Sequence, residues 1–156
     1  MAHDVKITQA DVTDVPELAR LLWLNTTNRE QHSLETFTVD LARWWTTHKH
    51  THVAFAASLA GQAGESELVG MAWVALVPRV PRPGLMSRLS ADIQSVFVHP
   101  DHRGQGIGSA LVEAATQHAE QLGSLHTTVH SGTRAVPVYE RLGFHSSPKL
   151  LQRYPD

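Results

Sequence analysis

The chain has 156 residues with a formal net charge of −2, and 42% of them are hydrophobic and 18% charged. These values predict a single folded domain over residues 1–156 and argue against a disordered chain and against a globally basic nucleic-acid-binding protein. Cysteine is absent, which excludes disulfides and thiolate metal sites. No apolar run is long enough for a membrane span, and the N-terminus has no secretory signal. We therefore expect a cytoplasmic protein with neither a membrane nor a nucleic-acid partner.

The first third of the chain predicts one strand and two helices. Alternation predicts a strand over 5–9, and Asp14 and Glu17 have the spacing of a capping box for a helix that runs to about Leu24. Pro16 fits the first turn of this helix. A polar loop over 25–33 leads to a second amphipathic helix over 34–48. The expected buried positions are Val15, Leu18, Ala19 and Leu22 in the first helix, and Phe37, Leu41, Trp44 and Trp45 in the second.

The middle of the chain predicts three strands. Segments 52–59 and 67–77 flank a glycine-containing connection over 61–66, which is typical of a hairpin. The second of these strands is apolar at both parities, so we expect it to be central and covered on both faces. Segment 78–88 holds three prolines and three arginines and predicts a loop, and 90–98 predicts the next strand.

The last third predicts a helix from Ile107 that ends at Gly123, a strand over 125–130, and a short helix over 135–142 closed by Gly143. The tail over 144–154 is expected to pair as a last strand or two. This order of elements is not a uniform repeat of strand and helix, and it predicts a mixed α/β fold.

A glycine-rich loop between the strand at 90–98 and the helix at Ile107 carries the clearest chemical signal. Gly104, Gly106 and Gly108 let backbone amides approach a ligand, and the helix start adds unpaired N–H groups and a partial positive charge. With Arg103 at its entry, the loop predicts an anion site suited to phosphate or pyrophosphate. It matches neither the P-loop pattern nor the dinucleotide fingerprint.

This segment, VFVHPDHRGQGIG over 96–108, resembles the strand and [Q/R]-x-x-G-x-[G/A] loop of the GNAT superfamily of N-acetyltransferases. A second block, Ala135 followed by YERLGF over 139–144, is similar to another motif of the same superfamily. The two blocks cover about residues 90–144. The resemblance implies a mixed, mostly antiparallel sheet of about six to seven strands, splayed between the fourth and fifth and flanked by about four helices.

The resemblance also implies acetyl-CoA as cosubstrate, with no metal. Its pyrophosphate would lie on the loop amides and its pantetheine arm along the preceding strand, chiefly at the backbone groups of Phe97 and Val98. A backbone N–H there would also polarise the thioester carbonyl. The coenzyme residues implied in this way are Val96, Phe97, Val98, Arg103, Gly104, Gln105, Gly106, Ile107, Gly108 and Ser109. Tyr139 stands where the family places the acid that protonates the departing thiolate, and the alternative is that its ring only packs against the acyl chain.

The sequence does not identify a single base that deprotonates the amine. Gln94 and Ser95 occupy positions where related proteins often have a carboxylate, and neither side chain can act as a base. The candidates are Asp92 first, then Glu35 and His130, with an ordered water or an amine that binds already neutral as further alternatives.

A second departure lies seven residues before Tyr139, where Gly132 replaces a frequent Asn. The corresponding hydrogen bond to the coenzyme is therefore lost or supplied by Ser131 or Thr133.

The predicted function is direct transfer of an acetyl group from acetyl-CoA to a primary amine of a small molecule or peptide. The loops 25–35 and 78–88 are expected to border the acceptor, and a homodimer is the default assembly. The alternatives are a catalytically silent acyl-CoA-binding module and a nucleotide-binding domain that uses the loop for another phosphate ligand. The alternating His48, His50 and His52 suggest a metal site, but we interpret them as a helix end and a strand start that do not share a face.

Overall fold

The computed structural model describes residues 4–60 and 66–156. In this part of the chain, one sheet of five strands has the order β1-β2-β3-β4-β5. The strands are β1 (Val5–Gln9), β2 (His52–Ala60), β3 (Ser66–Pro78), β4 (Leu89–Val98) and β5 (Ser124–Val129). Strands β1 to β4 are antiparallel neighbours, and β5 runs parallel to β4. The connection predicted over 61–66 lies, apart from Ser66, outside the described residues.

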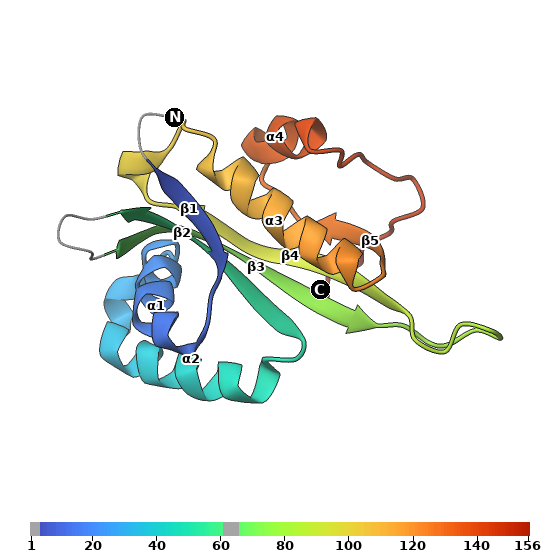
Figure 1. Ribbon diagram of the computed structural model, residues 1–156, viewed down its shortest axis with the longest axis horizontal. Helices are drawn as coiled ribbons and strands as arrows, with labels where there is room; N and C mark the ends of the chain where they lie inside the picture. Colours follow the sequence, from blue (N-terminus) through green and yellow to red (C-terminus); the bar gives the residue numbers. More distant parts are fainter. Residues whose placement is uncertain (1–3, 61–65) are drawn as a thin grey trace.

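Helices cover both faces of the sheet (Figure 1). They are α1 (Val15–Leu24), α2 (Leu34–His48), α3 (Ile107–Gln121) and α4 (Val136–Arg141). The helices α1 and α2 pack on one face, where Leu18, Leu41 and Trp45 share a core with Met71 and Trp73. Helix α3 covers the other face through Ile107 and Leu111, which pack with Val69, Val74 and Ile93.

The central position predicted for β3 is confirmed. Met71 and Trp73 belong to the core beneath α1 and α2, whereas Ala72 and Val74 belong to the core beneath α3. Because side chains alternate between faces, a strand that is apolar at both parities is buried only when both faces are covered. Each fully buried aliphatic side chain contributes about 1.5–3 kcal/mol, so β3 holds the two layers of helices together.

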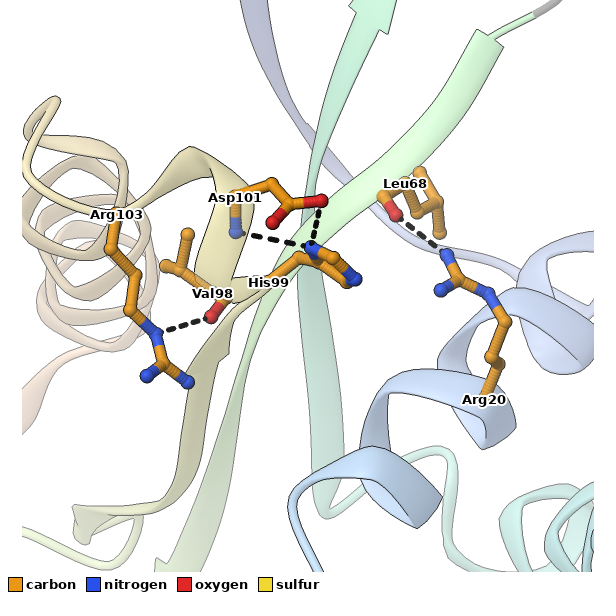
Figure 2. Close-up of polar contacts among 6 residues, drawn as sticks. All are labelled: Arg20, Leu68, Val98, His99, Asp101 and Arg103. Carbon is orange, nitrogen blue, oxygen red and sulfur yellow. Dashed lines mark hydrogen bonds and ion pairs between the residues drawn. The ribbon is translucent and has the colours of Figure 1, made fainter.

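The helix predicted to begin beside Asp14 is confirmed, but the capping box forms one turn earlier than predicted. A 3₁₀ turn over Val12–Asp14 precedes α1, and the Asp14 carboxylate accepts from the backbone N–H of Asp11 at 2.9 Å. Because its carboxylate is used there, Asp14 makes no side-chain cap on α1. Glu17 instead pairs with Arg20 at 2.9 Å, and Arg20 Nη2 also donates to the Leu68 carbonyl at 3.0 Å, which ties α1 to β3 (Figure 2).

The segment expected as a loop over 78–88 is a narrow arm that projects from the sheet (Figure 1). The Arg79 N–H donates to the Arg88 carbonyl at 2.8 Å, and Arg82 and Leu85 form an isolated bridge nearer the tip. The arm therefore continues the pairing of β3 with β4 beyond the body of the molecule.

The prediction of six to seven strands is wrong for the described residues, because the tail over 144–156 forms no strand. Pro148 and Pro155 lack the N–H that a ladder needs, and the apolar Leu150 and Leu151 are adjacent rather than alternating. Both leucines are exposed. The outer edge of β5 consequently has no strand partner in the described part of the chain.

Gly70 on β3 sets how closely α3 approaches the sheet. A Cβ at this position would lie 3.0 Å from Leu111 Cδ1 and 3.2 Å from the Phe97 carbonyl oxygen. The missing side chain thus lets the first turns of α3 lie directly over β3 and β4, which fixes the glycine-rich loop beside the end of β4. Within residues 4–60 and 66–156, no helix combines the length and the apolar character that crossing a membrane requires.

Candidate active site

The glycine-rich loop presents a run of free backbone donors. Gly104 and Gly106 have φ of 77° and 80°, a conformation that side chains disfavour, and Gly106 is the N-cap residue of α3. The N–H groups of residues 104–109 have no hydrogen-bond acceptor among the described residues, and the first helical bond runs from Ala110 to the Gly106 carbonyl at 3.1 Å. Successive free N–H groups at a helix start form a cradle for an anion such as a pyrophosphate.

Arg103 lies at the mouth of this loop with its side chain folded back along β4 (Figure 2). Its Nε donates to the Val98 carbonyl at 2.8 Å, and its guanidinium lies 5.4 Å from the centre of the Phe97 ring. The loop itself is braced by His99, whose Nδ1 accepts from the Asp101 N–H at 3.3 Å. Arg103 is therefore a positioned positive charge beside the cradle, next to the end of β4 (Figure 2).

Strands β4 and β5 separate beside the loop, as predicted. Their last paired residues are Ile93 with Val129, and β4 continues to Val98 without a partner on that side. On its other side, β4 stays paired with β3 along its length, apart from a bulge near Gln94. The part of β4 after Ile93 therefore offers an open edge that leads directly to the amide cradle.

The free backbone groups of this edge come from alternate residues. The His99 N–H donates to the Val69 carbonyl on β3 at 2.8 Å. Backbone groups of an antiparallel strand point to alternate sides, so the backbone N–H and C=O of Phe97, two residues earlier, also point toward β3. Val96 and Val98 face the open edge instead, and the Val98 carbonyl is the acceptor of Arg103. An extended ligand arm along this edge could therefore hydrogen-bond to the backbone N–H and C=O of Val96 and to the N–H of Val98. The backbone groups of Phe97 point into the sheet.

The bulge in β4 brings three polar side chains to one face. The register shifts between Trp73 and Val74, which leaves Gln94 without a partner on β3 and puts Gln94 and Ser95 on the side of α1 and α2. Asp92 shares that face, since Gln94 Nε2 donates to Asp92 Oδ2 at 3.3 Å. The other Asp92 oxygen accepts from Thr128 Oγ1 of β5 at 3.0 Å.

A cleft of about 360 Å³ opens over this bulge, between the sheet and the two N-terminal helices. It is lined by Leu22, Phe37, Asp40, Leu41, Trp44, His52, Trp73, Gln94 and Ser95. Trp44 was predicted within the buried stripe of α2, yet 40% of it is exposed because it borders this cleft. The cleft and the open edge of β4 meet at Gln94 and Ser95, so a molecule in the cleft and one along the edge would be neighbours.

His52 is the residue of this site that sequence reasoning missed. It begins β2, lines the cleft, and its Nδ1 lies 2.9 Å from Thr51 Oγ1. Burial lowers the pKa of His52 below its usual 6.5, and the facing Gln94 side chain opposes part of this shift. A histidine that is neutral at pH 7 can accept a proton. The alternation of His48, His50 and His52 drew attention to metal binding, but no group of three metal-ligating side chains occurs in the described segments.

Tyr139 lies on α4, with its ring edge-on to Phe144 at 5.5 Å. Burial raises the pKa of its phenol above the usual 10, and no hydrogen bond from a described residue contributes to that shift. The hydroxyl is therefore a protonated donor at neutral pH, available to a ligand.

The remaining candidates lie outside the cleft. Glu35 is exposed in the first turn of α2, and His130 is exposed after β5 with Nδ1 3.5 Å from Gln152 Nε2. Ser131 Oγ donates to the Gly132 carbonyl at 2.8 Å, so its hydroxyl proton is already used. Of the three candidates, Asp92 alone hydrogen-bonds to a described residue that lines the cleft, Gln94, although Asp92 does not itself line it.

Comparison with known proteins gives a consistent family. The sequence model of the acetyltransferase (GNAT) family matches residues 15–144. Glucosamine 6-phosphate N-acetyltransferase of Trypanosoma brucei brucei is 29% identical over 85 residues, which are 54% of this chain and 56% of that protein. Peptidyl-lysine N-acetyltransferase YjaB of Salmonella typhimurium is 33% identical over 99 residues, or 63% of this chain and 66% of the relative.

The chain thus matches between about half and two thirds of the length of these two curated relatives. Among solved structures, an acetyltransferase from Trypanosoma brucei superposes with a TM-score of 0.75 at 24% identity, covering 97% of this chain and 100% of the other. This structural likeness shows that the fold is shared along nearly the whole chain.

Proposed function

Because the chain belongs to the acetyltransferase (GNAT) family, we propose that it moves the acetyl group of acetyl-CoA directly to a primary amine of a small molecule or peptide. The observation that carries this proposal is the run of free N–H groups over 104–109 at the end of an open β4 edge. The names of the two relatives make a phosphorylated amino sugar and a lysine side chain candidate acceptors.

The residues of the cradle and the edge fit the two halves of the coenzyme. The N–H groups of residues 104–109 would bind its pyrophosphate, with the Arg103 guanidinium as an added positive charge. Val96 and the Val98 N–H would pair with the amides of the pantetheine arm as a further strand would. A backbone N–H at this edge would then donate to the thioester carbonyl oxygen as negative charge develops there.

The reaction needs one proton removed and one supplied. The neutral amine nitrogen forms a C–N bond to the thioester carbonyl carbon, the C–S bond breaks, and its electron pair leaves with the sulfur. One proton leaves the nitrogen and one reaches the sulfur, so an amine and acetyl-CoA become an N-acetyl amine and coenzyme A. An alkylammonium of pKa about 10.4 costs roughly 4–5 kcal/mol to deprotonate at pH 7, which a positioned base offsets in part.

Tyr139 is the proposed acid, because it stands where the family places this group and its phenol, whose pKa burial raises above 10, is protonated at neutral pH. Asp92 is the base proposed from the sequence, and its hydrogen bond to Gln94, which lines the cleft, supports it. His52 is a second candidate, because it lines the cleft and its pKa is lowered. The two are separated by comparing Asp92→Asn with His52→Gln, since the variant that removes the base loses the acid limb of the pH–rate profile for kcat/KM.

The test of the proposed function is release of free thiol from acetyl-CoA in the presence of a panel of primary amines, with mass spectrometry of the products. We expect thiol release that depends on both protein and amine, with a mass increase of one acetyl group on the amine. Binding of acetyl-CoA without release for any amine would instead indicate a silent acyl-CoA-binding module. Tight binding of ATP or NAD without binding of coenzyme A would indicate the nucleotide alternative.

A further inference from the structure

The walls of the cleft between the sheet and the N-terminal helices are aromatic and aliphatic. Phe37, Leu41 and Trp44 follow one another along α2 at spacings of four and three residues, so they share one face of that helix. Trp73 of β3 and Leu22 of α1 complete the apolar walls. The Trp44 ring lies edge-on to the Trp73 ring at 6.5 Å between centroids, so the two indole rings contact each other in the wall of the cleft.

Trp44 is held in place although it is partly exposed. Its ring stacks on His48 at 4.5 Å and meets His52 edge-on at 4.9 Å, so it has neighbours on the sheet and on its own helix. A large aromatic side chain that is 40% exposed and yet fixed in this way presents a preformed apolar surface to a ligand.

The charge of the residues that line the cleft is negative. Among the described residues that line the cleft, Asp40 is the single carboxylate and none is Lys or Arg. His52, whose pKa is lowered, adds no positive charge at neutral pH. A phosphorylated or carboxylated acceptor would meet an aspartate and no cation, whereas an ammonium group is attracted to it.

Apart from Asp40 on α2, the polar groups that line the cleft lie at one end. Gln94, Ser95 and His52 occupy the sheet side of the cleft, where it meets the open edge of β4. An acceptor must place its nitrogen at this end to reach a thioester on that edge, and the rest of the molecule then lies against the apolar walls.

Resting on the proposed function, we infer that the acceptor is an arylalkylamine, an uncharged aromatic ring that carries a primary amine on a short chain. The ring lies against Trp44, Trp73 and Phe37, and the amine lies beside His52 and Gln94. The same C–N bond formation and C–S bond breaking described above then apply to this amine.

The experiment compares kcat/KM for three acceptors at saturating acetyl-CoA, measured by thiol release. They are 2-phenylethylamine, ethanolamine, which keeps the aminoethyl group without the ring, and glucosamine 6-phosphate, which is polar and anionic. We expect 2-phenylethylamine to exceed each of the others by about tenfold or more, since an apolar pocket discriminates by that order for small apolar groups. A tenfold preference for ethanolamine or glucosamine 6-phosphate, or equal values for all three, would overturn the inference and leave the proposed function standing.

Two variants locate the effect. Trp44→Ala should lower kcat/KM for 2-phenylethylamine by about tenfold, mainly through KM, and reduce its advantage over ethanolamine. Val39→Ala changes an exposed residue of the same helix that does not line the cleft, and it should leave all three values unchanged. Equal effects of the two substitutions would contradict binding against Trp44.

If no acceptor is acetylated, calorimetric titration of 2-phenylethylamine into the protein with coenzyme A still tests the acceptor class separately from the proposed transferase activity. Binding that Trp44→Ala weakens would then support the acceptor class while the transferase activity fails. Absence of binding in that titration would overturn the acceptor class as well.

Discussion

At the scale of single residues, Tyr139 carries the clearest catalytic prediction. Tyr139→Phe removes the hydroxyl that would protonate the thiolate, so kcat should fall by about 10²-fold or more. The affinity for acetyl-CoA, measured by calorimetry, should change little, because the ring and its contact with Phe144 remain. Tyr154→Phe is the matched control, since Tyr154 is 69% exposed in the tail.

The pH profile gives this prediction a second readout. An acid catalyst works in its protonated form, and burial raises the pKa of Tyr139 above 10. The wild-type kcat should therefore stay level up to about pH 10 and decline only above it. Full activity of Tyr139→Phe would remove the acid role.

His52 makes a prediction about stability. Its pKa in the folded protein lies below the usual 6.5, chiefly because of burial, so the unfolded chain binds more protons between the two values. The free energy of unfolding should fall as the pH drops below about 6.5, and His52 should have no such effect above it. Urea unfolding at pH 5.0, 6.0 and 7.5 should show a shallower pH slope for His52→Gln than for the wild type. An unchanged slope would contradict the burial argument.

Among the elements, the start of α3 is the one whose backbone geometry is most directly testable. Gly106→Ala puts a Cβ at φ 80°, which costs about 1–2 kcal/mol or turns the free N–H groups away from their positions. We expect the affinity for acetyl-CoA to fall by about tenfold, measured by calorimetry. Gly123→Ala is the matched control, because Gly123 has φ 88° at the other end of the same helix and lies outside the loop. It should lower stability without changing coenzyme affinity.

The elements themselves could largely be predicted, because their signals are local. The predicted range of α2, Leu34–His48, is confirmed at both ends, since Ser33 caps its first turn and an apolar stripe runs through it. Two features depend on distant partners, so local sequence signals alone could not fix them. The bulge near Gln94 appears only in the pairing of β4 with β3, and the tail failed to form a strand although apolar residues are present in it.

On the scale of the whole molecule, the parts of the site also differ in whether their signals are local in the sequence or depend on distant partners. The amide cradle is one continuous segment with its own glycine pattern, so the sequence indicated it. The cleft draws on α1, α2, β2, β3 and β4, and its members carry no shared motif. The positions of Trp44 and His52 in the cleft therefore could be recognised only from the packing of the helices on the sheet.

Coenzyme binding should connect the cradle, the β4 edge and overall stability. A ligand that binds only the folded chain stabilises it by about 2.7 kcal/mol at a concentration of 100 Kd, which for a chain of this size raises Tm by about 5–10 °C. Acetyl-CoA should produce this shift, whereas ATP and NAD at equal concentration should not, because neither has a pantetheine arm to pair with Val96 and Val98.

Amide hydrogen exchange locates the same effect within the molecule. Acetyl-CoA should slow exchange at residues 104–109, whose N–H groups have no acceptor in the described structure, and at Val96 and Val98 on the open edge. Gly106→Ala should weaken both the protection and the Tm shift. Equal shifts with ATP, or protection confined to residues away from the loop and β4, would contradict coenzyme binding at this cradle.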